Sequence, residues 1–308
     1  MKHAPLLIPA VLFLLLAGSQ SALNPAGGGA MATTPVAVAP AAPVLPISKG
    51  IDRQLKVVVG PPDATLAAWV LEPKAGTAIR GTILFLHGFM ANHLQLENAG
   101  EALRNAGYRA VLIDLRGFGQ SSGGNITFGV LDAKDMTQLV DQLQAEDLCG
   151  PTLGVYGTSY GAASAILYAA ADPRVTTVVV VAPFATIRDE VPSFSRNALR
   201  SVGGLLSDSN LNAIANAVSQ VVKWDLDAAR PVDVIAKSAA HILLIHGDAD
   251  TIIPHAASEL LHAADPKNSE LLTVANRGHL DLCFDVRGEL QKPTRNWFDQ
   301  YLPPKAHQ

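Results

Sequence analysis

The sequence predicts an α/β fold in which helices cover both faces of a mostly parallel β-sheet. From residue 53 onward, short apolar segments with strand character alternate with segments of helical periodicity, as repeated β-α units do. The apolar runs 81–86 and 175–182 are almost uninterrupted, as in strands buried on both faces. The stretch 153–171 is typical of a strand that turns sharply into a helix.

The expected elements follow in order along the chain. Segments 53–59 and 64–71 predict an antiparallel pair across the turn 60–63, which contains glycine and proline. Further strands are expected over 81–86, 108–115, 153–156, 175–182, 242–246 and 271–274. Helices are expected over 94–105, 131–143, 161–171, 255–263 and 289–301. The segment 131–143, for example, has its apolar residues on one helical face.

Residues 186–240 interrupt this rhythm, because a single crossover helix needs far fewer residues. One helix is expected to begin at the capping residues 207–209. Four apolar residues that follow share one face of it: Leu211, Ile214, Val218 and Val221. Residues 197–206 are also apolar at helical spacing. We therefore expect a small helical cap over the carboxyl ends of the strands, where open α/β sheets bind ligands. The alternative is additional scaffold without a role in binding.

The first 49 residues predict export rather than fold. Lys2 and His3 precede an apolar run over 6–17 and small residues over 17–22, which suits a signal peptide covering 1–21. The apolar run is shorter than the ~20 residues of a membrane span, although an uncleaved anchor is the alternative. Residues 22–49 are rich in alanine and proline and are expected to be a linker, followed by a folded domain over 50–304.

Composition limits the range of partners. The chain of 308 residues has a formal charge of −4 and no basic stripe, so nucleic acid is not expected to bind. An apolar share of 49 % is ample for one large core. The two cysteines, Cys149 and Cys283, are expected at opposite ends of the sheet and therefore free, since a disulfide needs Cα atoms within about 7 Å.

The sequence around Ser159 has the form G-x-S-x-G, with Gly157 and Gly161 at its ends. Glycine fits these positions because such a tight turn brings the backbone before and after the serine together. The motif alone occurs by chance in roughly one chain in ten of this length, given average glycine and serine usage. Its meaning therefore depends on a base, a carboxylate and an oxyanion hole elsewhere.

Candidates for these groups follow other strands. The segment after strand 242–246 offers Asp250 and Asp248; we predict that Asp250 orients the base and that Asp248 stabilises its loop. Among the histidines, His279 is the predicted base, because it follows the last strand in a loop that Gly278 makes flexible. Two other histidines, His87 and His246, are expected to bond locally at strand ends. Four more are expected at the surface or at helix ends: His93, His241, His255 and His262.

Two backbone N–H groups are the expected oxyanion donors. One belongs to Tyr160, the residue after the serine, and the other to Phe89, in the loop after strand 81–86. The Phe89 and Met90 side chains then remain free to line an apolar acyl pocket.

Together these segments resemble the α/β-hydrolase family over about residues 53–301. The resemblance rests on segments in this order: His87-Gly88-Phe89, 114–121, 157–161, 246–254 and Gly278-His279. It implies an eight-stranded sheet and no cofactor, and no metal site is predicted. The segment 114–121 is usually structural in this family. The serine esterases, thioesterases and prolyl-oligopeptidase-like hydrolases are the most similar subgroup.

The sequence thus predicts an exported serine hydrolase that cleaves carboxylic or thio esters of a small acyl substrate. In this prediction Ser159 is the nucleophile, His279 the base and Asp250 the orienting carboxylate. A serine peptidase with the same groups is the alternative within enzymes, although no segment is long enough for a propeller domain. A non-catalytic binding protein of the same fold is the alternative outside them. A dehalogenase or epoxide hydrolase would need aspartate at position 159.

Overall fold

The computed structural model describes residues 51–302 except positions 125, 151, 199–206 and 223–224. The predicted signal peptide (1–21) and linker (22–49) lie outside these residues, as do positions 199–206 of the apolar stretch 197–206. Within the described part of the chain, no helix has both the length and the apolar character needed to cross a membrane.

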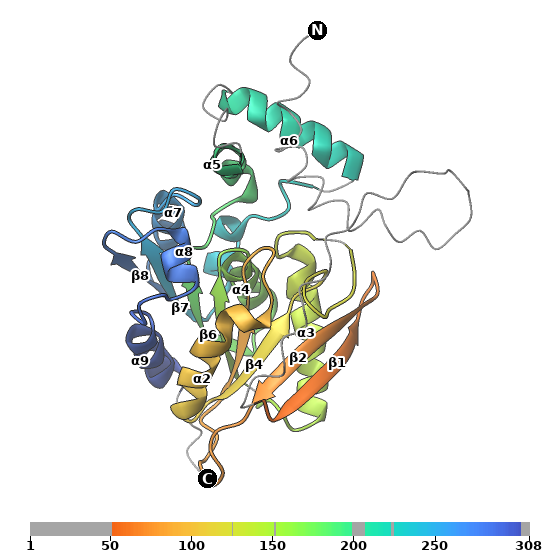
Figure 1. The fold of residues 1–308 in the computed structure, drawn as a ribbon, viewed down its shortest axis with the longest axis vertical. Coiled ribbons are helices and arrows are strands. Elements are labelled where there is room, and N and C mark those ends of the chain that lie inside the picture. The colour runs from red at the N-terminus through yellow and green to blue at the C-terminus, as the bar shows by residue number, and fades with distance from the viewer. Residues whose placement is uncertain (1–50, 125, 151, 199–206, 223–224, 303–308) are drawn as a thin grey trace, which may run out of the picture.

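An eight-stranded sheet forms the centre of the molecule, in the order β1-β2-β4-β3-β5-β6-β7-β8 (Figure 1). Its strands are β1 (Arg53–Val59), β2 (Ala64–Leu71), β3 (Thr82–Leu86), β4 (Arg109–Asp114), β5 (Leu153–Thr158), β6 (Val175–Val181), β7 (His241–Gly247) and β8 (Ser269–Val274). The strands from β3 onward are mutually parallel, whereas β2 is antiparallel to both β1 and β4. The predicted mostly parallel sheet with an antiparallel pair at its edge is therefore confirmed.

Helices cover both faces of the sheet. The helices longer than one turn are α2 (Glu97–Asn105), α3 (Val130–Ala145), α4 (Tyr160–Ala171), α5 (Ile187–Ala198), α6 (Asp208–Val222), α7 (Ala256–Ala264), α8 (His279–Cys283) and α9 (Gln291–Tyr301). Short 3-10 turns lie at η2 (His93–Leu96), η4 (Pro231–Asp233) and η5 (Ile235–Lys237). Side chains of α3, α4 and α7 pack in one core, and those of α2, α8 and α9 pack in a second core on the opposite face.

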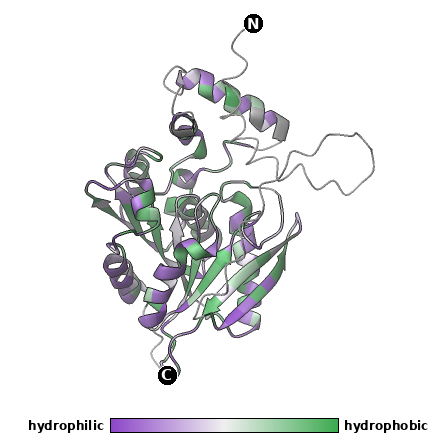
Figure 2. Ribbon diagram, in the orientation of Figure 1, coloured by the Kyte–Doolittle hydropathy of each residue, from purple (hydrophilic) through white to green (hydrophobic). Residues whose placement is uncertain are grey.

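The distribution of hydropathy agrees with this layering. Apolar residues concentrate on the central strands, while the outer helices carry much of the polar surface (Figure 2). The strand β5 shows how the two cores are divided, because its successive side chains point to opposite faces. Val155 belongs to the core under α3 and α4, and Tyr156 to the core under α2 and α9.

The predicted helical cap corresponds to α5 and α6, which pack against each other beyond the end of β6 (Figure 1). Leu211 of α6 is buried and Ile214 is half-buried, as their spacing predicts; the side chains of Val218 and Val221 lie outside the described residues. Ser207 accepts a hydrogen bond from the backbone N–H of Asn210 at 3.3 Å, as a helix-capping hydroxyl does.

Candidate active site

Ser159 lies at the sharp turn between β5 and α4. Its backbone has φ = 52° and ψ = −114°, a left-handed conformation that costs energy in a residue with a Cβ. The Ser159 N–H donates to the carbonyl oxygen of Val181 at 2.8 Å, which holds the turn against β6. A Cβ at Gly157 would overlap the Gly161 carbonyl, and a Cβ at Gly161 would overlap that of Leu86. The close backbone approach inferred from the motif is present.

The structure brings Ser159, His279 and Asp250 together from three separate strand ends. The Ser159 Oγ lies 2.9 Å from His279 Nε2, and His279 Nδ1 lies 2.7 Å from Asp250 Oδ2. Each of the three residues is at most 8 % exposed. A carboxylate only accepts hydrogen bonds, so His279 Nδ1 carries the proton, and Nε2 of the neutral ring accepts from the serine hydroxyl.

Asp250, rather than Asp248, contacts the histidine. Asp250 Oδ1 accepts the backbone N–H groups of Ile252 and Ile253 at 2.8 and 2.9 Å, which leaves Oδ2 directed at His279. Asp248 instead accepts the backbone N–H of Asn276 at 2.6 Å. This contact ties the loop after β7 to the loop after β8, as expected of a loop-stabilising carboxylate.

The charges of this pair stabilise each other. Burial raises the pKa of Asp250, but hydrogen bonds from His246, His279 and the Ile253 N–H outweigh it and hold that pKa well below its usual range. Burial lowers the pKa of His279, but the Cys283 sulfur and the Asp250 carboxylate oppose it, and the net pKa is raised. The Asp250 carboxylate carries a full negative charge at neutral pH. It therefore makes His279 a stronger base than free imidazole.

Three other histidines support the strand ends around the site. His87 Nδ1 lies 2.7 Å from the Gly88 carbonyl and Nε2 accepts the Leu115 N–H at 3.0 Å; burial lowers its pKa to about 4. His246 Nε2 contacts both the Ile253 carbonyl, at 2.9 Å, and Asp250. His93 lies at a helix end, as expected, because it is the first residue of η2, but it is buried rather than at the surface. Its ring stacks on Trp69, and its Nδ1 lies 2.8 Å from Asp114 Oδ1.

The expected oxyanion donors lie on either side of Ser159. Tyr160 is the first residue of α4, and a helix leaves its first N–H groups without intrahelical acceptors. Phe89 lies in a tight turn after β3, where Ala91 N–H donates to the Gly88 carbonyl at 3.2 Å and Met90 has φ = 57°. Phe89 and Met90 both line the cavity at Ser159.

Gln95 joins this turn to the helix that carries the histidine. Its Oε1 accepts the Gly88 N–H at 2.7 Å, and its Nε2 donates to the Cys283 carbonyl at 3.3 Å. One side chain thus spans from the residue before Phe89 to the end of α8. No sequence pattern singled out this glutamine, because its partners are backbone groups that are distant along the chain.

An open cleft of about 830 Å³ contains Ser159 and His279. Much of its wall is apolar: Phe89, Met90, Leu94, Phe194, Ile252 and Leu280. Met90 and Leu280 are more than half exposed at its mouth, as is Phe284. The cleft therefore combines a polar end at Ser159 and His279 with an apolar wall.

The loop expected around His279 is a short helix instead. His279 is the first residue of α8, and the Asp281 carboxylate accepts the Gly278 N–H at 3.0 Å, which closes the turn. The aspartate three positions after glycine was the sequence signal for this cap.

The two cysteines are free and lie at opposite ends of the sheet, as predicted: Cys283 ends α8, and Cys149 precedes β5. Among the described residues, no cluster of histidine, cysteine, aspartate and glutamate suits a metal ion.

Known proteins resemble the chain in sequence and in fold. The family described as serine aminopeptidase, S33, matches residues 77–230. The uncharacterised protein YqkD of Bacillus subtilis is 26 % identical over 221 residues, which cover 71 % of each chain.

Two solved esterases share the fold. The Pyrococcus furiosus esterase Pf2001 aligns with a TM-score of 0.62 and 17 % identity, over 81 % of this chain and 92 % of that one. Est1E from Butyrivibrio proteoclasticus aligns with a TM-score of 0.59 and 18 % identity, over 80 % of this chain and 98 % of that one. With the match over residues 77–230, the chain belongs to the serine aminopeptidase S33 family of α/β-hydrolases and is a hydrolase.

Proposed function

We propose that the protein hydrolyses carboxylic or thio esters of small acyl substrates through an acyl-enzyme on Ser159. The observation that carries this proposal is the hydrogen-bonded series from Ser159 through His279 to Asp250, with a strained serine at the end of β5. Such a series activates a hydroxyl that is otherwise a weak nucleophile. No cofactor is needed for this chemistry.

In the first half of the reaction, the Ser159 Oγ attacks the carbonyl carbon while His279 Nε2 takes its proton. Asp250 stabilises the imidazolium that forms. The backbone N–H groups of Tyr160 and Phe89 donate to the carbonyl oxygen as it becomes negative. The carbon–oxygen (or carbon–sulfur) bond to the leaving group then breaks, and His279 returns the proton to the departing alcohol or thiol.

In the second half, water replaces the leaving group. His279 takes a proton from the water, and the hydroxide attacks the acyl carbon of the acyl-enzyme. The bond between carbon and Ser159 Oγ breaks, and the serine recovers its proton from His279. The products are a carboxylic acid and the regenerated enzyme. The apolar wall of the cleft suits an acyl chain rather than a charged group.

A fluorophosphonate probe tests the nucleophile directly. The purified protein should gain one phosphonyl group, located by mass spectrometry on the peptide that contains Ser159. The rate of p-nitrophenyl butanoate hydrolysis should fall in proportion to the fraction of protein that is labelled. An unlabelled protein, or a label on another serine, would contradict the proposal.

The pH profile follows from the raised pKa of His279. The ring must be neutral to accept the serine proton, so kcat/KM for p-nitrophenyl butanoate should rise with pH as the imidazolium is lost. Because the His279 pKa is raised above the ordinary value of 6.5, the midpoint should lie above pH 6.5. Initial rates across a pH series measure it. A midpoint at or below 6.5 would mean that Asp250 does not act on the base as described.

Replacing Gln95 with alanine should lower kcat by about tenfold and change KM by less than about threefold, because a turn that moves by a fraction of an ångström misplaces the Phe89 N–H in the transition state. Gln95→Glu should not restore the rate, since it loses the donor to the Cys283 carbonyl. Gln142→Ala removes an exposed glutamine whose side chain donates to Glu146, the residue after α3, and is the control. An equal loss for Gln142→Ala, or a change in KM alone, would refute a positioning role.

A second candidate function, cleavage of an amino-terminal residue, is favoured by Glu190 on α5. This side chain is 3 % exposed, and its Oε2 has no hydrogen-bond partner within the described part of the chain. Burial raises its pKa to about 8; Asp189 and Asp250 add to this and His279 opposes it, so the carboxyl lies within electrostatic reach of the site. A substrate ammonium group would supply the missing partner.

Two substrates separate the candidates. An aminopeptidase should cleave alanine p-nitroanilide, and Glu190→Gln should lower that kcat/KM by about tenfold or more, since glutamine cannot take up the negative charge that a bound ammonium group favours on Glu190. An esterase should cleave p-nitrophenyl butanoate and be little affected by the same change. Failure of the wild-type protein on the anilide would eliminate the aminopeptidase.

We further propose, from the N-terminal sequence, that the chain is exported and that residues 1–21 are removed. Fractionation of cells that produce the full chain, followed by N-terminal sequencing, tests this. An intact N-terminus on membranes would show the alternative, a retained anchor.

A further inference from the structure

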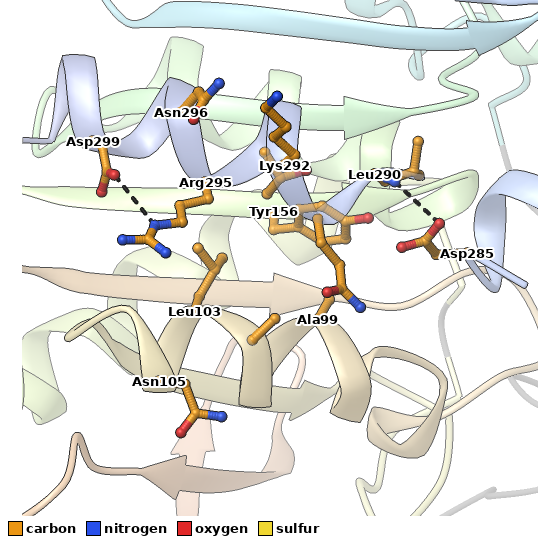
Figure 3. A pocket seen from close by; sticks show the side chains of 13 residues that line it. Ala99, Leu103, Asn105, Tyr156, Asp285, Leu290, Lys292, Arg295, Asn296 and Asp299 are labelled. Carbon is orange, nitrogen blue, oxygen red and sulfur yellow. Dashed lines mark hydrogen bonds and ion pairs between the residues drawn. The ribbon is translucent and has the colours of Figure 1, made fainter. Parts of the chain in front are cut away.

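Beyond the cleft at Ser159, a second cavity of about 610 Å³ lies between α2 and α9, on the face of the sheet occupied by Tyr156 (Figure 3). Tyr156 lies between the two helices, with Ala99 and Leu103 on the α2 side and Lys292 and Asn296 on the α9 side. Nothing in the hydrolytic mechanism uses this cavity.

Two residues in its wall carry hydroxyl groups for which no hydrogen bond is found among the described residues. Tyr156 is only 3 % exposed, and its pKa is raised above the ordinary range by burial, then by Asp285 and Cys283, with no hydrogen bond contributing. No hydrogen bond of its hydroxyl is found among the described residues. Thr294 is also 3 % exposed, and its Oγ1 is buried and has no hydrogen-bond partner among the residues that the structure describes. An unpaired buried hydroxyl costs free energy, and Thr294 supplies one beside this cavity. The Tyr156 hydroxyl, in contrast, is not fully buried and can pair with a ligand in the cavity.

A smaller cavity of about 330 Å³ lies between this one and the cleft. It shares Gln95, Asn98, Cys283 and Phe284 with the cleft. It shares five residues with the Tyr156 cavity, namely Ala99, Ala102, Tyr156, Asp285 and Gln291. The three spaces therefore follow one another along α2, starting at Ser159.

The backbone separation of Tyr156 and Ser159 sets a lower limit on the length of this path. Tyr156 precedes Ser159 by three residues at the end of β5, which corresponds to roughly 10 Å along a strand. A substrate group that reaches Tyr156 from a carbonyl at Ser159 must therefore span at least that length.

The chemistry of the wall selects a neutral polar group. Its charged residues are two acids and two bases: Asp285, Asp299, Lys292 and Arg295. Asp299 accepts from Arg295 at 3.4 Å, and Asp285 accepts the Leu290 N–H at 3.1 Å (Figure 3). Arg80 also pairs with Asp299, at 2.8 Å. With no excess of either sign, neither an anion nor a cation is favoured. The remaining polar groups are amides and hydroxyls, which pair with ligand hydroxyls: Asn105, Gln291, Asn296, Tyr156 and Thr294.

We propose that the space between α2 and α9 is a branch of the active site that binds the alcohol portion of an ester, and that this alcohol is a neutral polyhydroxylated group at least about 10 Å long, such as a disaccharide. The inference rests on the proposed esterase function. The apolar wall of the cleft receives the acyl chain, and the alcohol leaves along α2 with the proton that His279 delivers.

Three butanoyl esters test the branch: a disaccharide monoester, octyl butanoate of similar length, and ethyl butanoate. The wild-type protein should show kcat/KM for the disaccharide ester at least about tenfold above that for the octyl ester, which corresponds to 1.4 kcal/mol. Tyr156→Phe should lower kcat/KM for the disaccharide ester by about three- to tenfold, the value of one hydrogen bond, and leave the other two esters unchanged. Tyr301→Phe, on α9 outside the branch, is the control.

Ala102→Phe, which places a ring in the branch from α2, should abolish the preference for the disaccharide ester. Hydrolysis of ethyl butanoate by the same preparation shows that each variant is folded. No preference in the wild-type protein, or an equal loss on all three esters in Tyr156→Phe, would overturn the branch while leaving the esterase proposal intact. Failure on every ester, ethyl butanoate included, would instead refute the proposed function.

Discussion

Replacing Ser159 with alanine is expected to lower kcat for p-nitrophenyl butanoate by about 10⁶-fold, because the variant has no atom that can form the acyl-enzyme. The substitution removes only the Oγ that lies 2.9 Å from His279 Nε2. The cleft and the oxyanion donors remain, so a residual rate of about 10³-fold over water is expected, along with nearly unchanged substrate binding.

Ser164→Ala is the matched control. Ser164 is a buried serine one turn further along α4, and its hydroxyl donates to the Tyr160 carbonyl at 3.0 Å. This variant should keep kcat within about threefold of the wild-type value, since a hydroxyl bonded back within its helix contributes little. Wild-type turnover in Ser159→Ala, confirmed with protein free of contaminating esterase, would end the serine mechanism.

The arrangement of strands was predictable because each signal was local. The run 175–182 predicted β6 (Val175–Val181) almost to the residue, since few other structures bury so many branched side chains in a row. The pair 53–59 and 64–71 was predicted with its observed bounds, because glycine and proline mark the turn between them. The helix predicted over 289–301 is α9, which begins two residues later, at Gln291, and ends at Tyr301 as predicted.

The meeting of Ser159, His279 and Asp250 was predictable from position rather than from sequence distance. Each follows a parallel strand of one sheet, and parallel strands place their carboxyl ends at one edge. The separation of 120 residues between Ser159 and His279 therefore says little about their distance in space. Their roles in catalysis stay predictions until the variants are measured.

The remaining features depend on contacts without a local signal. Gln95 bonds two backbone groups from distant segments, and nothing about a glutamine in a helical stretch indicates them. A glutamate at position 190 is typical of the exposed face of an amphipathic helix. It is buried because of how α5 packs, which the sequence does not indicate. The cavity at Tyr156 arises from the spacing between α2 and α9, which side-chain packing determines.

Asp250→Asn is expected to lower kcat by about 10⁴-fold through the wrong imidazole tautomer. The reason lies in the two backbone N–H groups of Ile252 and Ile253, which both donate to Asp250 Oδ1. An asparagine must keep its carbonyl oxygen there, so its NH₂ group takes the place of Oδ2 and faces His279 Nδ1. That nitrogen must then accept, which puts the ring proton on Nε2, opposite the Ser159 hydroxyl.

The same substitution makes a second, independent measurement possible. Removing the negative charge beside His279 should lower the pKa of the imidazole, so the acid limb of the residual activity should move to lower pH. Asp248→Asn is the control, since Asp248 bonds the Asn276 N–H and not the histidine; less than about a tenfold change in kcat is expected, that is, under 1.4 kcal/mol. A larger loss for Asp248→Asn than for Asp250→Asn would reassign the carboxylate. An unchanged acid limb in Asp250→Asn would show that the 2.7 Å contact orients the ring without setting its basicity.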